Sequence, residues 1–184
     1  ALTFYVEIFR NIPSVALHYS IVQGPHQTYY NAYSGACRIF CLNYYFNRPP
    51  TLYEDGQQIR DYVNIEDVVR ANLLVMTDDR ANDRVFNVGG GRGYTVREFA
   101  DIVRQAFGKD LAAVVPGLYR YGDTRHIQSD ISALQALGWT PRKTPADSVQ
   151  AYRDYLYEQI DIDDIMEYAE RKMRELNVVR KTQA

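Results

Sequence analysis

Residues 86–98, with the sequence FNVGGGRGYTVRE, have the composition of a phosphate-binding turn. A β-branched and aromatic run leads into a glycine cluster, and a helix is expected directly after it. A dinucleotide-binding turn needs glycine at its first, third and sixth positions, for the turn, the pyrophosphate and helix packing. Here Gly89, Gly91 and Gly93 stand first, third and fifth. The spacing argues against a dinucleotide site and favours tight backbone turns beside a ligand or another domain.

A second candidate is the arginine in the stretch QQIRDYV. Arg60 follows the pair Asp55-Gly56, which favours a tight hairpin turn, and it is followed by a run typical of a strand. On a strand, Arg60 and Tyr62 point to the same side, and Asp61 points to the other. Arg60 could present its planar fork to a phosphate, or it could form a surface ion pair. The stretch alone favours the ion pair.

The stretch YRYGDTRHIQSDIS adds Arg120 and Arg125. Together with Arg60, these two arginines could converge on a diphosphate, because the guanidinium fork matches phosphate geometry. Spacing along the chain does not show whether they meet. His126, in the same stretch, could be a structural side chain or a general base.

Tyr168 and Lys172 have the Tyr-x-x-x-Lys spacing of short-chain dehydrogenases. In that chemistry a lysine one helical turn away lowers the pKa of the tyrosine hydroxyl. The pair lies in a charged C-terminal helix, away from any cofactor motif. The chain holds sixteen tyrosines, so the spacing arises readily by chance. We therefore interpret this pair as part of a surface helix.

The composition is that of a globular chain of 184 residues, with 46% hydrophobic and 24% charged residues. A net charge of -2 does not indicate a surface that binds nucleic acid, which would need a clustered basic excess. No run approaches the about 18 apolar residues of a membrane span, and the first residues lack the pattern of a signal peptide. Cys37 and Cys41, expected on one helix face, are poor disulfide partners, and no nearby Cys/His set completes a metal site. We expect a reduced, cytoplasmic chain.

The expected elements are short strands and longer helices, which is an α/β pattern. Residues 14–22 read as one buried strand, and Thr95 with Glu98 forms a capping box for the best-marked helix. Further helices are expected in the first residues, over residues 31–46, after Asn64, after Asp130 and after Thr144. The last helix carries an apolar stripe of Ile162, Ile165, Met166, Ala169, Met173 and Leu176.

Four segments carry a family resemblance: GPHQ, LYEDGQQIRDYVNIEDVVRANLL, FNVGGGRGYTVREFADIV and YRYGDTRHIQSDISALQALGWTP. In this order and spacing they resemble the C-terminal half of the NAD-dependent epimerase/dehydratase family, the extended short-chain dehydrogenases that act on nucleotide sugars. The resemblance covers about residues 1–157. It implies a C-terminal remnant of a Rossmann-like domain in residues 1–30, a small mixed α/β substrate-binding lobe in 31–158, and a C-terminal helix and tail in 159–184.

The resemblance also implies roles for individual residues. Arg60 and Arg120 match the arginines that hold the diphosphate, and Tyr53 matches an aromatic position lining the base pocket. Ser34 matches a substrate-contacting position, and Tyr19 and Ser20 match residues near the nicotinamide. The glycine run matches the family's turn from a lobe strand into a capped helix, beside the substrate cleft.

The sequence departs from the family at two positions. Ile21 stands where an asparagine often contacts the substrate phosphate, and His26 stands where arginine is common after Gly-Pro.

The same resemblance implies NAD as the cofactor of the complete enzyme. This chain has neither the NAD glycine motif nor a catalytic Tyr/Lys pair in a fitting position, so we expect no catalytic residue here and no activity of the chain alone. The first hypothesis is therefore the substrate-binding half of a nucleotide-sugar epimerase or dehydratase. The alternative is a non-catalytic sugar-nucleotide-binding or oligomerisation module. In either case we expect self-association through exposed apolar surface in residues 1–22.

Overall fold

The computed structural model describes residues 12–28, 35–164, 166–176 and 178–181. Within these ranges, no helix is long and apolar enough to cross a membrane. The elements are β1 (Val15–Tyr19), β2 (Ile21–Gln23), α2 (Ala36–Tyr45), β3 (Ile59–Asn64), α3 (Ile65–Thr77), η1 (Asp79–Ala81), β4 (Arg84–Val88), β5 (Gly93–Thr95), α4 (Val96–Ala106), β6 (Leu118–Arg120), α5 (Ser132–Gln135), α6 (Pro145–Glu158), α7 (Met166–Glu175) and β7 (Val179–Lys181).

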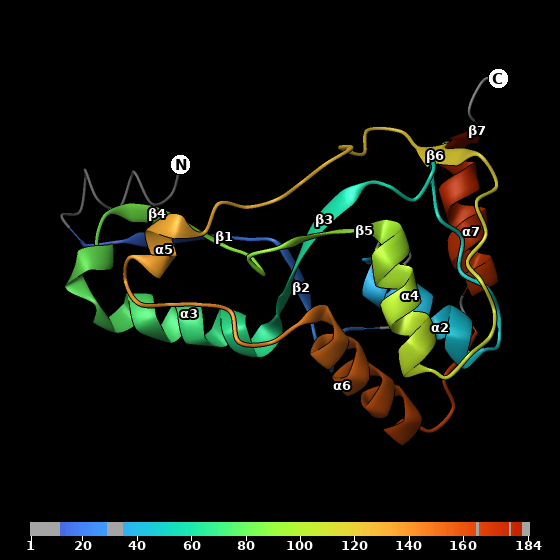
Figure 1. The fold of residues 1–184 in the computed structure, drawn as a ribbon, viewed down its shortest axis with the longest axis horizontal. Coiled ribbons are helices and arrows are strands. Elements are labelled where there is room, and N and C mark those ends of the chain that lie inside the picture. Colours follow the sequence, from blue (N-terminus) through green and yellow to red (C-terminus); the bar gives the residue numbers. More distant parts are fainter. Residues whose placement is uncertain (1–11, 29–34, 165, 177, 182–184) are drawn as a thin grey trace.

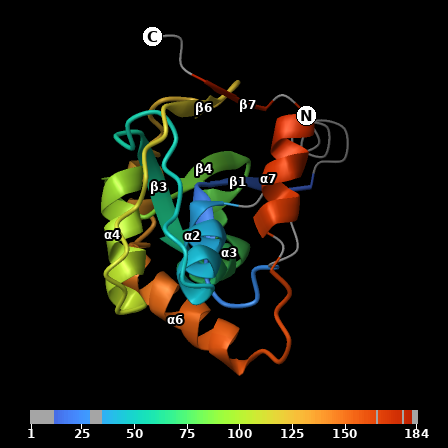
Figure 2. The same ribbon diagram turned by 90° about the vertical axis from the view of Figure 1, so that its right-hand side faces the viewer.

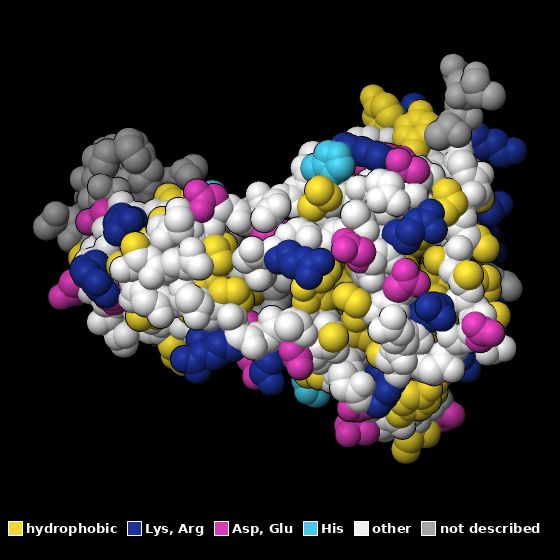
Figure 3. Space-filling model, in the orientation of Figure 1, with side chains coloured by type: hydrophobic (Ala, Val, Ile, Leu, Met, Phe, Trp, Pro, Cys, Tyr) yellow, Lys and Arg dark blue, Asp and Glu magenta, His cyan; other side chains and the backbone are white. Residues whose placement is uncertain are grey.

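The molecule is elongated, and the two ends have different contents (Figure 1). β1, β4, α3 and α5 gather at one end, whereas α2, α4, α7, β6 and β7 gather at the other. β3 runs between the ends, and α6 lies beneath α2 and α4 in this view. The face seen in Figure 3 carries positive and negative side chains interspersed over both ends. The predicted α/β class is confirmed, with both parallel and antiparallel strand pairs.

The predicted strand over residues 14–22 is interrupted. β1 pairs in parallel with β4, and the backbone N–H of Ser20 continues this ladder by donating to Val88 O at 2.9 Å. β2 then pairs in parallel with β3 instead. The prediction of one buried strand was wrong in two respects, because the chain changes partner at Ser20 and the last residues of β1 are exposed. β1 has one strand neighbour in the described part of the chain, which leaves its side chains incompletely covered.

The local signals for helix ends are confirmed. Asn64 caps α3 by accepting the N–H of Glu66, and the predicted capping box of Thr95 and Glu98 is present at α4. Thr144 caps α6. These motifs act within one helical turn, so they are independent of how the helices later pack.

The predicted hairpin around Asp55-Gly56 did not form as a strand pair. The turn itself is present, with Glu54 at φ 52° and Gly56 at φ 75°. β3, however, pairs with β2 on one edge and with β5 on the other. With both edges of β3 occupied, the residues before the turn cannot join it. Thr51 instead forms a bridge with Val114.

Two clusters of buried hydrophobic residues hold the elements together. One fills the space among α2, α4 and α6 and includes the buried free cysteines Cys37 and Cys41. The other joins α3, β4 and α5 around Phe86 and Trp139. The segments that build the two clusters alternate along the sequence. The division into 1–30, 31–158 and 159–184 stays a prediction.

The glycine run lies directly against β3. A Cβ atom on Gly90 would lie 2.0 Å from the carbonyl oxygen of Tyr62, and a Cβ on Gly89 would lie 2.3 Å from Oδ2 of Asp61. The N–H of Gly90 donates to Oδ1 of Asp61 at 2.7 Å. Glycine is therefore required here for close approach of the chain to β3 and its buried carboxylate.

We predict that Gly90→Ala lowers the free energy of unfolding by about 3 kcal/mol, because the added methyl group meets backbone that cannot move aside. Urea unfolding followed by circular dichroism measures this. Gly35→Ala is the matched control, since its Cβ would meet only Ile21 Cγ2 at an ordinary 3.6 Å. It should change stability by less than about 1 kcal/mol. Equal midpoints for Gly90→Ala and the parent chain would contradict the packing argument.

Candidate functional site

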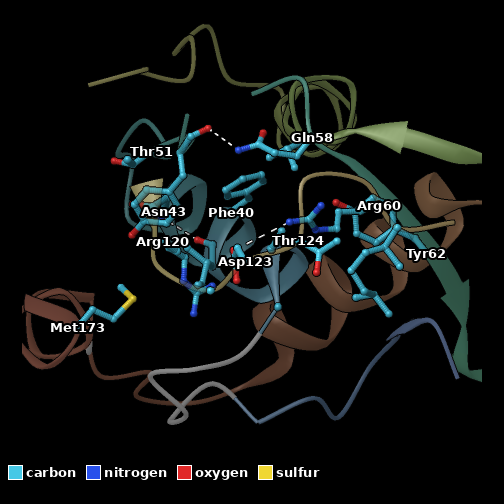
Figure 4. A pocket seen from close by; sticks show the side chains of 18 of the residues that line it. Phe40, Asn43, Thr51, Gln58, Arg60, Tyr62, Arg120, Asp123, Thr124 and Met173 are labelled. Atoms are coloured by element: carbon cyan, nitrogen blue, oxygen red, sulfur yellow. Dashed lines mark hydrogen bonds and ion pairs between the residues drawn. The ribbon is translucent and has the colours of Figure 1, made fainter. Parts of the chain in front are cut away.

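A cavity of about 580 Å³ lies between α2, β3 and the segments around residues 48–58 and 118–127, with α7 at one side. Its wall is part apolar and part polar, as in many small-molecule sites. Figure 4 shows Arg60, Thr124 and Tyr62 toward one end and Met173, Thr51 and Asn43 toward the other, with Arg120 and Asp123 between them. Further lining residues are Ile21, Gly35, Ala36, Ile39, Phe40, Arg48, Pro49, Tyr53, Gln58, Val96, Gly122 and Ile127.

Arg60 reaches the cavity from β3. Arg60 and Tyr62 both line it, whereas Asp61 contacts the glycine run, so the predicted alternation is confirmed. Nη1 of Arg60 donates to the carbonyl oxygens of Ile59 at 2.9 Å and Arg125 at 3.0 Å. Nη2 lies 3.9 Å from Oδ2 of Asp123, and the side chain is 13% exposed. Nη1 of the guanidinium is thus held by two carbonyl oxygens, while Nη2 lies 3.9 Å from the partly exposed carboxylate of Asp123.

Arg120 and Tyr53 line the same cavity as Arg60, but Arg125 does not. Arg125 instead forms ion pairs with Glu54 and with Asp55, whose Oδ2 lies 2.7 Å from Nη2. The hydrogen bonds from Arg125 hold the pKa of the Asp55 carboxyl well below its ordinary value. Of the three arginines considered for a diphosphate, Arg60 and Arg120 line one cavity. Arg125 instead attaches the 118–127 segment to the turn after Tyr53.

His126 has a structural contact. Its Nδ1 accepts the backbone N–H of Ile59 at 3.3 Å, and the neighbouring N–H of Ile127 donates to Ile59 O at 3.0 Å. Of the two roles left open for His126, these bonds support the structural one, because they attach the segment to the start of β3.

Tyr62 is unsuited to act as a base. Burial raises the pKa of its phenol well above the ordinary value, and the nearby charge of Arg60 opposes this only in part. Its ring stacks on Phe99 with 4.3 Å between the centroids.

The wall of the cavity as a whole offers cations, hydrogen-bonding groups and apolar side chains. This combination suits the binding of an anionic molecule.

The other residues predicted to bind substrate or cofactor are dispersed. Ser34 lies outside the described residues. The Tyr19 hydroxyl donates to Oδ1 of Asn72 at 2.9 Å, and the ring is about half exposed. Ser20 donates to Oδ2 of Asp61 at 3.1 Å and shares a hydrogen bond with Ser129. Neither Tyr19 nor Ser20 lines the cavity, and their proximity to a nicotinamide stays a prediction.

The glycine run does not line the cavity either, and its expected position beside a substrate cleft stays a prediction. The run also does not fit a dinucleotide phosphate, because oxygens of Asp61 and Tyr62 occupy the space that its missing Cβ atoms leave. Tyr168 is exposed on α7, in keeping with a surface helix. Among the described residues, no group of three or more His, Cys, Asp or Glu is placed to hold a metal ion.

Several cavity residues were not singled out from the sequence. They comprise polar side chains from α2 and the loops, and one side chain from α7: Asn43, Thr51, Gln58, Thr124 and Met173. The polar ones carry no spacing signal, since each comes from a different segment. Met173 did stand out as a member of the apolar stripe of the last helix, and that stripe predicted burial of this side chain without saying where.

Comparison with known proteins gives a consistent family. The model of the NAD dependent epimerase/dehydratase family matches residues 3–89. The chain is 29% identical over 150 residues to a dTDP-L-rhamnose 4-epimerase of Burkholderia thailandensis. The aligned region covers 81% of this chain and 41% of that protein. It is 31% identical over 152 residues to a dTDP-glucose 4,6-dehydratase of Haemophilus influenzae, covering 67% of this chain and 44% of the relative.

The solved structures agree. A UDP-glucose 4-epimerase from Thermotoga maritima, solved with UDP-glucose, superimposes with a TM-score of 0.77 at 31% identity, over 85% of this chain and 50% of that one. A UDP-glucose 4-epimerase from Thermus thermophilus, solved with NAD, gives 0.74 at 28% identity, over 86% and 51%. The chain thus spans about half the length of these relatives. With its order of motifs, its α/β fold and these matches, the chain belongs to the NAD-dependent epimerase/dehydratase family.

Proposed function

We propose that this chain is the substrate-binding part of an NAD-dependent nucleotide-sugar epimerase or dehydratase. The observation that carries the proposal is the placement of Arg60 and Arg120, 60 residues apart in sequence, on the wall of one cavity together with Tyr53. A diphosphate is the anion that best suits two guanidinium groups presented to one space. The aromatic ring and the apolar residues of the cavity suit the groups on either side of such a diphosphate.

The contacts of Arg60 explain how it would hold a phosphate. Two backbone carbonyls fix one edge of its guanidinium, so little rotational freedom is lost when the other edge binds an anion. The carboxylate of Asp123, at 3.9 Å, is too far for a close ion pair. A diphosphate would compete with Asp123 for Arg60 and would gain the shorter, charge-assisted hydrogen bonds.

In this proposal bound NAD would supply hydride transfer from and back to the sugar, and groups outside this chain would hold most of it. Tyr19 and Ser20 are the proposed contacts of this chain with the nicotinamide end. The task of this chain's residues is to hold the diphosphate and direct the sugar toward that end. Ile21, which follows Ser20 and lines the cavity, would provide an apolar wall where the family often has an asparagine.

We predict that Arg60→Gln and Arg120→Gln each weaken binding of UDP-glucose about tenfold or more, because each removes charge-assisted hydrogen bonds to phosphate. Isothermal titration calorimetry on the whole chain measures this. Arg92→Gln is the control, since Arg92 is an exposed arginine that pairs with Glu98 and does not line the cavity. If the two variants bind UDP-glucose as tightly as the parent chain, the diphosphate role is wrong.

We also predict that this chain alone gives no turnover when mixed with NAD and UDP-glucose, because the glycine run that would have to hold the dinucleotide is filled by the chain's own oxygens. Chromatographic separation of the nucleotide sugars after incubation provides the measurement. Conversion of UDP-glucose to another nucleotide sugar above a protein-free blank would overturn the assignment of a binding part without catalytic groups.

Self-association is the remaining proposal about partners. The apolar surface expected in residues 1–22 is described only from residue 12 onward, where Ile12 and Tyr19 are exposed. α3 adds an exposed apolar stripe formed by Ile65, Val69, Leu73 and Met76. We predict a mass above that of the monomer in light scattering at high concentration, reduced by Leu73→Lys but not by Leu176→Lys, just after α7. A monomer at every concentration would contradict it.

A further inference from the structure

One side of the cavity is built by residues beyond the family resemblance, which ends at about residue 157. Met173 of α7 lines the cavity and is 6% exposed, whereas Leu176, directly after this helix, is 59% exposed. α7 packs beside α2, as Figure 2 also shows. Of the apolar stripe predicted for this helix, Met173 therefore contributes to the wall of the cavity.

The same region is attached to the strand that carries Arg120. β7 pairs antiparallel with β6, with Val179 opposite Arg120. The pairing is extended by the N–H of Tyr121, which donates to Val178 O at 2.8 Å. The guanidinium of Arg180 lies 4.0 Å from the centroid of the Tyr121 ring. β6 has no other strand partner among the described residues, so the hydrogen-bonded pairing with β7 holds the backbone of β6 in position.

Two further contacts join this region to the cavity wall. The N–H of Val178 donates to Met173 O at 3.1 Å, which couples the end of α7 to β7. Arg48, itself a lining residue, forms an ion pair with Asp164 at 2.6 Å, just before α7. The wall at this side is thus held by a strand pair, an ion pair and a buried side chain.

The position of Met173 indicates which part of a nucleotide sugar would lie beside it. The sugar has to face Tyr62 and Ile21, which are opposite each other on β3 and β2, because these strands lead to the proposed nicotinamide contacts. Met173 lies at the other end of the cavity, with Thr51 (Figure 4). Thr51, Tyr53 and Met173 also line an adjoining cavity of about 190 Å³. This end is therefore left for the nucleobase.

We propose that α7 and β7 form the nucleobase end of the site, with Met173 against the base and β7 holding Arg120 in position for the diphosphate; the proposal rests on the proposed function. A methionine thioether is flexible and polarisable and makes favourable contacts with aromatic rings, which suits a flat base opposite Tyr53. The elements beyond the family resemblance would thus set base affinity through a direct contact and phosphate affinity through the backbone of β6.

The direct contact is tested with Met173→Ala in the whole chain, measured by calorimetry with two probes, UDP-glucose and inorganic pyrophosphate. We expect roughly five- to tenfold weaker binding of UDP-glucose and unchanged binding of pyrophosphate, which has no base. Met173→Leu, which retains an apolar side chain of similar size, should bind UDP-glucose within about twofold of the parent. Leu176→Ala, at an exposed position directly after α7, should leave both affinities unchanged.

The positioning role of β7 is tested with Arg180→Pro and Arg180→Ala. Proline removes a backbone N–H and disturbs the pairing with β6, so Arg180→Pro should weaken the binding of UDP-glucose and of pyrophosphate alike. Arg180→Ala keeps the backbone N–H and should weaken the binding of both probes less than Arg180→Pro does. Circular dichroism of each variant establishes that the rest of the chain is folded.

The outcomes separate this inference from the proposed function. Two results would show that the base contact is wrong while the proposed function stands, provided that the parent chain binds UDP-glucose. Either Met173→Ala binds UDP-glucose as tightly as the parent, or its affinities for UDP-glucose and pyrophosphate fall by the same factor. If Arg180→Pro binds both probes as the parent does, the positioning role of β7 is wrong. A parent chain that binds neither probe overturns both proposals.

Discussion

The arrangement of this chain depends on one buried carboxylate. Asp61 is 1% exposed, and its two oxygens accept hydrogen bonds from Ser20 Oγ at 3.1 Å, the Gly90 N–H at 2.7 Å and the Ser129 N–H at 3.0 Å. These three groups come from the break between β1 and β2, from the glycine run, and from the segment before α5. A single side chain on β3 therefore gathers three distant parts of the chain, and a buried charge is tolerated because each donor compensates its lost hydration.

The position of Asp61 also determines which way its neighbours face. Successive strand side chains point to opposite sides, so burial of Asp61 against the glycine run turns Arg60 and Tyr62 toward the cavity. The glycines accommodate this carboxylate and the backbone of β3, which leaves them no room for an external phosphate. The glycine run, which has the composition of an anion-binding turn, thus binds the carboxylate of Asp61 in the same chain.

The three arginines show how position in the fold assigns different tasks to similar residues. Arg125 meets Glu54 and Asp55 and becomes a fastening between two loops. Arg60 is oriented by carbonyl groups and faces the cavity, and Arg120 reaches the same space from β6. Charge alone did not distinguish them, because Arg125 lies close enough to Glu54 and Asp55 for short ion pairs, whereas Arg60 and Arg120 line the cavity.

The sequence by itself determined the features that act over a few residues. The caps at Asn64, Thr95 and Thr144, the turn at Gly56 and the alternation around Asp61 were all predictable, because each depends on local backbone geometry. Only the tertiary structure decided that the turn would not make a hairpin, since both edges of β3 are taken by strands from elsewhere. It likewise separated Arg120 from Arg125 and placed Met173 in the cavity wall, because those outcomes depend on contacts between segments that are distant along the chain.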